Sequence, residues 1–304
     1  MFRTKDLVLL LVVFSSMGTG LIWPQEAGRL APFLNWFLML MLFLAFLKIF
    51  PQAIWSTVRQ YPYYLIILLF IKLIILPLLI FSLAVKIFPA YALGLLMLAG
   101  VSTGVSAPFF TGVVGGNIAL VLVMTVVTSI LLPFSMPLMV KLLAGRDLSI
   151  DLIHLGSLIG VIIFLPLAAA GLTRRLGPRL TDWLEERSYF LSLILIGLIN
   201  LGSFGNFAPF LQAHQDQLVV ALLLSSGLAV VLAATGAMVF WFRPPPQRTA
   251  AAASLGWINN VLVIVLGNDL NDPFTSILAA LYLIPFHILI VPLSHLNKTF
   301  RRRP

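Results

Sequence analysis

Long stretches without a charged residue constrain the fold of this 304-residue chain more than any other feature. Four of them cover Ile87–Val140, Ser188–Gln215, Gln217–Phe242 and Thr249–Asn268. Each can hold one or more segments of about 20 apolar residues, the length that crosses the hydrocarbon core of a bilayer. Only 10% of the residues are charged, whereas a soluble domain carries about 25%. The sequence therefore predicts an all-α, polytopic membrane protein.

The apolar pattern predicts ten membrane-spanning helices that form a single transmembrane unit. Their approximate ranges are Leu7–Trp23, Pro32–Phe50, Tyr63–Val85, Tyr91–Val114, Ile118–Leu143, Ile150–Leu172, Tyr189–Leu211, Gln217–Phe242, Thr249–Gly267 and Phe274–Leu296. A charged linker, 173–188, is expected in the cytoplasm. It separates residues 1–172, which hold the first five-helix repeat and the sixth span, from residues 189–304, the remainder of the second repeat.

The distribution of Lys and Arg predicts the orientation. With the N-terminus inside, 14 of these residues fall on cytoplasmic segments and four on the opposite side, with Lys72 apart. This positive-inside bias predicts an inner (plasma) membrane protein with both termini cytoplasmic. Five spans in each half also give the halves opposite orientations, as an inverted repeat requires. Because the net charge of +9 lies in short loops and the tail, nucleic acid is not an expected partner.

Two of the ten spans are poor continuous helices. Gly, Ser, Thr and Pro interrupt the fourth span between Gly100 and Pro108, and Ser, Gly and Asn interrupt the ninth between Ser254 and Asn260. Small residues that pack helices together would explain one such span. Two at corresponding positions of two halves favour broken, crossing helices around the binding site of a transporter.

Broken helices create a polar site inside the membrane. Their exposed N–H groups favour anions at each half-helix N-terminus, and their free carbonyls favour cations at the C-terminal ends. The side chains that we expect around this site are Ser102, Thr103, Ser106, Thr111, Ser254, Asn259 and Asn260.

Lys72 is the only charged residue deep inside a predicted span, and no carboxylate lies deep inside one to neutralise it. An ammonium at this depth costs about 2.5–3.5 kcal/mol on insertion scales, which marks a functional site. Snorkelling to the interface is disfavoured because about ten residues lie on either side, at a rise of 1.5 Å each. A structural lysine that holds the crossing helices together stays an alternative. His287 in the tenth span is a further candidate, with helix packing as its alternative role.

Several segments resemble the bile acid:sodium symporter family. The run Gly100–Pro133 resembles the glycine-rich crossover of that family, and Ser254–Gly267 resembles its second crossover segment. Pro77 and the pair Phe286–His287 also fall where the family has similar residues. The resemblance covers nearly the whole chain. It implies ten spans that form panel and core subdomains from inverted repeats.

The resemblance also implies a sodium site, and the chain departs from it. Thr125 and Asn259 are retained, but Lys72 stands where the family has a sodium-contacting glutamine. The other positions that lack the ligand implied by the family are Ala107, Pro108, Val121, Ser254 and Ile258. Sodium needs several oxygen ligands, usually with a carboxylate, and this set has lost most of them. The ammonium of Lys72 is thus expected to occupy the place of the ion.

These observations predict a secondary active transporter that moves a small organic anion across the bilayer by alternating access. It is expected to work without sodium and without a cofactor, and Lys72 could exchange a proton because burial disfavours its charged form. A sodium-coupled organic anion symporter is the first alternative, and a non-transporting membrane sensor or scaffold is the second. An enzyme is not expected, since the sequence shows no catalytic triad, phosphate loop or cysteine. The oligomeric state is left open.

Overall fold

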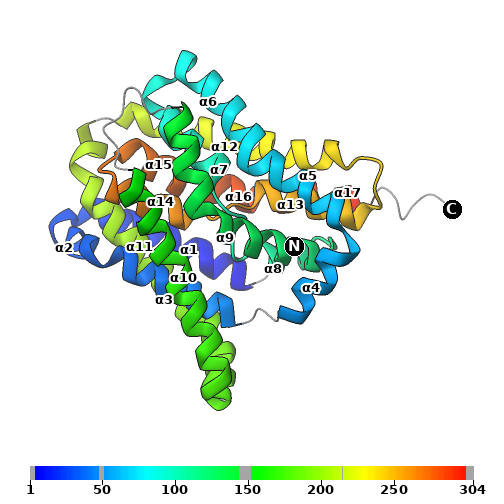
Figure 1. Cartoon of the computed structure of the whole chain (residues 1–304). Helices are drawn as coiled ribbons and strands as arrows, with labels where there is room; N and C mark the ends of the chain where they lie inside the picture. The colour runs from blue at the N-terminus through cyan, green and yellow to red at the C-terminus, as the bar shows by residue number, and fades with distance from the viewer. Residues whose placement is uncertain (1–3, 48–50, 144–151, 214, 299–304) are drawn as a thin grey trace.

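The structure, a computed structural model, describes residues 4–47, 51–143, 152–213 and 215–298 (Figure 1). Within these ranges all regular elements are helices, and one isolated β-bridge is present. The elements are α1 (Thr4–Ile22), α2 (Pro24–Gly28), η1 (Ala31–Phe33), α3 (Leu34–Leu47), α4 (Pro51–Gln60), α5 (Pro62–Phe70), η2 (Ile71–Ile75), α6 (Leu76–Ile87), η3 (Pro89–Tyr91), α7 (Ala92–Gly100), α8 (Ala107–Val113), α9 (Ile118–Leu143), α10 (Leu152–Leu176), α11 (Pro178–Ala213), α12 (Gln215–Val239), α13 (Pro245–Gly256), α14 (Asn260–Asp269), α15 (Pro273–Leu281), α16 (Leu283–Ile288) and α17 (Ile290–Lys298).

Length and hydropathy identify fewer membrane spans than the ten that the sequence predicts. Six helical segments of the described residues can cross a membrane, and the bent pair α15–α16 with α17 gives a seventh. The six are Pro24–Leu47, Pro62–Ile87, Ile118–Leu143, Ile153–Leu176, Pro178–Phe210 and Gln215–Val239. Three further apolar helical segments are shorter than a full span: Leu11–Ile22 of α1, Pro89–Gly100, which includes α7, and α14. The fourth and ninth predicted spans are each divided between two short helices, which lowers this count.

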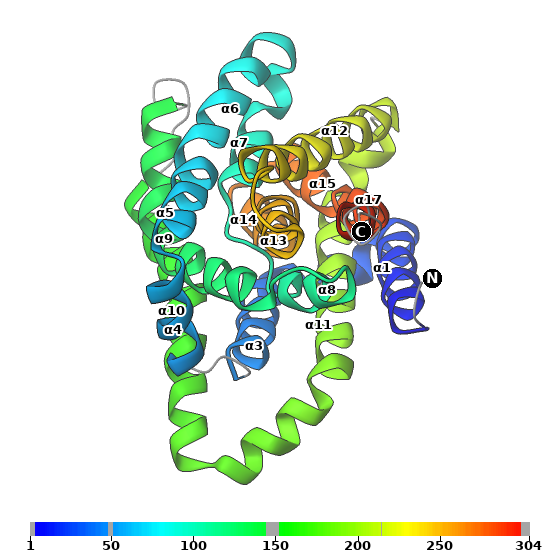
Figure 2. The same ribbon diagram turned by 90° about the vertical axis from the view of Figure 1, so that its right-hand side faces the viewer.

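The helices pack in two sets. Helices α1, α2, α3, α10 and α11 contact one another, and α5–α9 with α12–α17 make the second set. The sets meet where α9 packs on α10 and where α14 contacts α3 and α11. Small residues allow close helix packing within the second set. A Cβ atom at Gly236 of α12 would lie 2.4 Å from the carbonyl oxygen of Ala251 on α13. As a result α13 is buried near the middle of this set (Figure 2).

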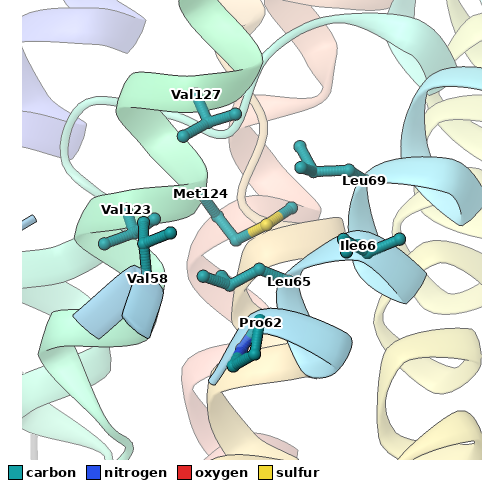
Figure 3. Close-up of a pocket in the computed structure, with 8 residues that line it drawn as sticks. All are labelled: Val58, Pro62, Leu65, Ile66, Leu69, Val123, Met124 and Val127. Carbon is teal, nitrogen blue, oxygen red and sulfur yellow. The ribbon is translucent and has the colours of Figure 1, made fainter. Parts of the chain in front are cut away.

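The helix that carries Lys72 has a widened turn at that residue. Between α5 and α6 the backbone of Ile71–Ile75 is a π-helix. Pro77 follows at the start of α6 and has no N–H to donate to the carbonyl of Leu73. A local π segment is a known way to accommodate such a gap and is frequent at functional sites. The α5 part of this helix also borders an apolar groove that it shares with α4 and α9 (Figure 3).

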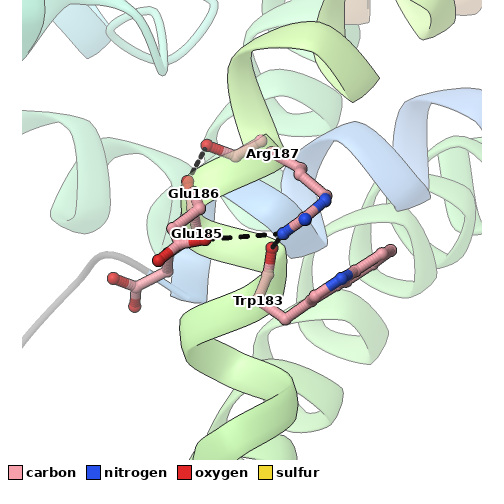
Figure 4. Close-up of polar contacts among 5 residues, drawn as sticks. Trp183, Glu185, Glu186 and Arg187 are labelled. Atoms are coloured by element: carbon pink, nitrogen blue, oxygen red, sulfur yellow. Dashed lines mark hydrogen bonds and ion pairs between the residues drawn. The ribbon is translucent and has the colours of Figure 1, made fainter.

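The charged segment 173–188, expected as a linker, is helical except at Gly177, because α10 ends at Leu176 and α11 begins at Pro178. Arg, Glu and Leu favour helix, and the charge of Arg and Glu keeps the segment out of lipid without preventing helix formation. Within α11, Arg187 donates to the Trp183 carbonyl at 3.3 Å, stacks 4.6 Å from the Trp183 ring and pairs with Glu186 at 3.4 Å (Figure 4). These exposed contacts contribute about 0–1 kcal/mol each.

Candidate functional site

Two helix breaks meet and pair with each other. The chain leaves helix after Gly100 and re-enters at Ala107, and it does so again between Gly256 and Asn260. Thr103 and Ile258 form an antiparallel β-bridge across the two breaks. The N–H of Gly104 donates to the Trp257 carbonyl at 2.7 Å, and the N–H of Asn259 donates to the Ser102 carbonyl at 2.9 Å. The pairing satisfies backbone groups that hydrocarbon could not.

Glycine is required at the point of closest approach. A Cβ atom at Gly104 would lie 2.7 Å from the carbonyl oxygen of Ile258 and 3.0 Å from its carbonyl carbon. Both neighbours are backbone atoms of the opposite break and cannot rotate away. Gly104 thus lets the two breaks approach closely enough to hydrogen-bond.

Thr103 ties the crossing to two helices. Its hydroxyl donates to the Ser254 carbonyl on α13 at 2.7 Å, and its N–H donates to the hydroxyl of Thr128 on α9 at 3.0 Å. Thr125, one turn earlier on α9, donates to the Gly104 carbonyl at 3.3 Å and to the Val121 carbonyl at 3.0 Å. Thr128 was not among the residues chosen from the sequence. Its spacing of three from Thr125, on the same helix face, was the available signal.

Lys72 reaches the same crossing from the π segment. Its side chain is 0% exposed, and its Nζ donates to the Leu255 carbonyl at 3.3 Å. Leu255 lies in the last turn of α13, directly before the break. The two ion pairs found among the described residues are Arg29–Glu26 and Arg187–Glu186, so no carboxylate neutralises Lys72 in this part of the chain. A buried ammonium therefore faces the carbonyl end of a half-helix.

Three hydroxyls near this crossing are buried without a protein hydrogen-bond partner among the described residues. They are the Oγ atoms of Ser102, Ser129 and Ser254, in side chains at most 2% exposed. Ser102 and Ser129 each neighbour a member of the Thr103–Thr128 hydrogen bond, and the Ser254 carbonyl accepts from Thr103. An unsatisfied buried hydroxyl costs about 1–3 kcal/mol, so each of these groups is suited to contact a polar ligand.

The two asparagines of the ninth predicted span have different partners. Asn259 caps α14, because its Oδ1 accepts from the N–H of Leu262 at 3.3 Å. Asn260 donates from Nδ2 to the Ala279 carbonyl on α15 at 3.1 Å. Tyr282, which sequence analysis did not single out, donates from its hydroxyl to the Gly256 carbonyl at 2.7 Å. This bond satisfies a carbonyl at the end of α13, where the second break begins.

The remaining candidate residues lie beside the crossing. Ser106 is exposed at the start of α8, and the buried Thr111 donates within that helix to the Ala107 carbonyl at 2.7 Å. His287 contacts the Leu283 carbonyl through Nδ1 at 2.9 Å, and its ring lies 5.6 Å from that of Phe110. Phe110 also packs on Trp257, which sequence reasoning passed over. His287 thus belongs to an aromatic cluster behind the break.

This architecture defines a class of protein. Several apolar helices long enough to span a bilayer make the chain an integral, multi-pass helical membrane protein. Groups of His, Cys, Asp or Glu that could hold a metal are not found among the residues that the structure describes. Comparison with family models matches residues 35–199, over half of the chain, to the sodium bile acid symporter family. The chain belongs to this family, whose members are membrane transporters. A search of curated proteins found no match.

Proposed function

We propose that the protein is a secondary active transporter that moves a small organic anion by alternating access. In this proposal ten spans form two inverted five-helix repeats, with α7–α8 and α13–α14 as the fourth and ninth. The matching order of helices and breaks in the two halves supports it. The protein lies in the inner (plasma) membrane with both termini in the cytoplasm. The distribution of Lys and Arg supports this orientation.

One observation carries the proposal: the fully buried Nζ of Lys72 donates to the carbonyl end of α13 at the crossing of the two breaks. A lone cation at bilayer depth is costly and is retained where it serves ions or substrates. The half-helix that begins at Asn260 points its positive end toward the same crossing. A positive charge and a helix N-terminus together favour an anionic substrate.

We further propose that Lys72 replaces sodium as the fixed cation of the site. Ala107, Pro108, Val121 and Ile258 offer no side-chain oxygen at positions where the family resemblance implies ion ligands. The Oδ1 of Asn259 already accepts from a backbone N–H, and the Thr125 hydroxyl shares its one proton between two carbonyls. Proton exchange at Lys72 would couple transport to pH instead. Ser102, Ser129 and Ser254 would supply neutral hydrogen-bond partners to the ammonium or to the substrate.

The first experiment separates a transporter from a sensor or scaffold. Organic anions that shift the melting temperature of the purified chain are selected, and the uptake of each is measured in reconstituted vesicles. We expect uptake that saturates with concentration and is lost in Lys72→Met. Binding without uptake under any imposed ion gradient would contradict the proposal and support a sensor.

A further inference from the structure

An apolar groove lies on the outside of the second helix set, away from the crossing (Figure 3). It has a volume of about 160 Å³ and is lined solely by apolar side chains from α4, α5 and α9. Val58 and Pro62 line one end, and Leu69 and Val127 line the other (Figure 3). The groove runs along the first two turns of α5.

The groove opens sideways. Ile66, at its edge, is 61% exposed, whereas Leu65 and Met124 behind it are at most 4% exposed. Both α5 and α9 belong to segments that are long and apolar enough to cross a membrane. The medium outside Ile66 is then the hydrocarbon of the bilayer, and an acyl chain is the natural occupant of an apolar groove that opens there.

The α4 end of the groove carries a cation. Arg59 directly follows the groove residue Val58, is exposed, and holds its guanidinium 4.9 Å from the ring of Trp55, which is 59% exposed. Ile54 and Val58, on the adjacent face of α4, pack against the protein core. An exposed Trp–Arg pair on a short amphipathic helix is typical of the membrane–water interface. The guanidinium presents a fork of donors that matches a phosphate.

We propose that this groove binds an acyl chain of an anionic glycerophospholipid, with the phosphate of that lipid at Arg59. With the topology proposed above, α4 lies on the cytoplasmic side and the lipid belongs to the cytoplasmic leaflet. The site itself does not depend on that topology. Met124, which lines the groove, lies on the same helix, α9, as Thr128 of the crossing. Its carbonyl accepts from the Thr128 hydroxyl at 2.6 Å, and the same hydroxyl accepts from Thr103. The bound lipid therefore supports the helix that holds the crossing.

The test uses the full chain in detergent and two lipids with identical acyl chains, phosphatidylglycerol and phosphatidylcholine. Native mass spectrometry counts the lipids that each variant retains. Val127→Trp fills the groove, and Leu138→Trp is the matched control because Leu138 is a 50% exposed residue of α9 outside the groove. Arg59→Gln removes the charge at an exposed position and leaves the groove intact.

We expect the wild-type chain and Leu138→Trp to retain one phosphatidylglycerol and Val127→Trp to lose it. Arg59→Gln should reduce the preference for phosphatidylglycerol over phosphatidylcholine about tenfold, the effect of one charge-assisted contact. Equal retention by both tryptophan variants would overturn the proposal. So would a lipid-free dimer that Val127→Trp dissociates, since the groove would then be a protein interface. Lipid retention by a chain that transports nothing supports this site and contradicts only the proposed function.

Discussion

Lys72 carries a large energetic cost and has a single hydrogen-bond partner among the residues that the structure describes. Its ammonium is fully buried and donates to one carbonyl, that of Leu255. Removing an ion from water costs several kcal/mol even after relaxation. One charge-assisted hydrogen bond returns about 1.5–3 kcal/mol. Such a residue lowers the stability of the fold, which is consistent with retention for function.

The first prediction follows from these magnitudes. Lys72→Met should stabilise the protein by about 1–4 kcal/mol, as when buried ions are replaced by apolar groups. This figure is the net change: the carbonyl of Leu255 loses its partner, at about 1–3 kcal/mol, but the removed cost of the buried charge is larger. Thermal unfolding in detergent measures the change, and Lys86→Met, an exposed lysine of α6, is the control. A lower melting temperature for Lys72→Met would instead identify a structural lysine.

Asp272 supplies a prediction about pH. It caps α15 by accepting from the N–H of Phe274 at 3.1 Å, with a further bond from the Thr275 hydroxyl. Burial raises the pKa of this carboxyl above its usual value, despite these hydrogen bonds. The folded state therefore binds the proton more tightly than the unfolded state does. Stability from this group is full below the unfolded pKa of about 3.9 and is lost as pH rises through the folded pKa.

Asp272→Asn keeps an oxygen at the cap and removes the titration. The melting temperature of this variant, relative to that of the wild type, should increase as the pH rises from acidic to neutral. Parallel unfolding curves across that pH range measure the difference. A difference that stays constant or shrinks with pH would show that the burial of Asp272 does not govern its protonation.

At the scale of elements, the crossing depends on close backbone contact. Gly104→Ala places a methyl group against the Ile258 carbonyl, so the bridge between the breaks must open or shift. We expect a loss of about 1–3 kcal/mol, the usual cost of overpacking. Gly18→Ala in α1 is the control, because a Cβ there meets nothing within 4 Å. It should be neutral or stabilising by up to about 1 kcal/mol, since alanine favours helix. Similar melting temperatures for both variants would contradict the described crossing.

Sequence patterns predicted the helix breaks well because the cause is local. Gly100 and Pro108 bracket one break and Gly256 and Asn260 the other, and such residues disfavour helix wherever they occur. The depth of Lys72 was equally readable from the length of its apolar run. The partners of these residues were not readable. Thr128 and Tyr282 contact the breaks from distant parts of the chain, the Trp257 ring packs on Phe110 of α8, and a single sequence carries no record of which distant residues meet.

At the scale of the molecule, the two helix sets are linked by polar contacts at the C-terminal end of α14. Asn268 donates to the Ser203 hydroxyl on α11 at 2.7 Å and accepts from Asn206 at 3.1 Å. Asn35 on α3 donates to Asp269 at 3.3 Å. If the sets move against each other during alternating access, these bonds must break in one of the two states.

Asn268→Ala removes two of these links and should favour the state that is open at this end. The chain contains no cysteine, so a single Phe207→Cys, at a buried position of α11, gives a clean report of exposure. We expect Asn268→Ala to react several-fold faster with a water-soluble thiol reagent than the same cysteine in the otherwise wild-type chain. Asn117→Ala, at the start of α9, is a control distant from α14. Unchanged labelling would show that the contacts do not hold the sets together.

The central claim, that Lys72 stands in for sodium, is tested most directly by the uptake of one identified organic anion into reconstituted vesicles. Uptake is measured with an inward sodium gradient, with potassium in its place, and with a proton gradient alone. The account predicts equal uptake in sodium and potassium, a response to the proton gradient, and no uptake by Lys72→Met. Uptake that strictly requires sodium would contradict it.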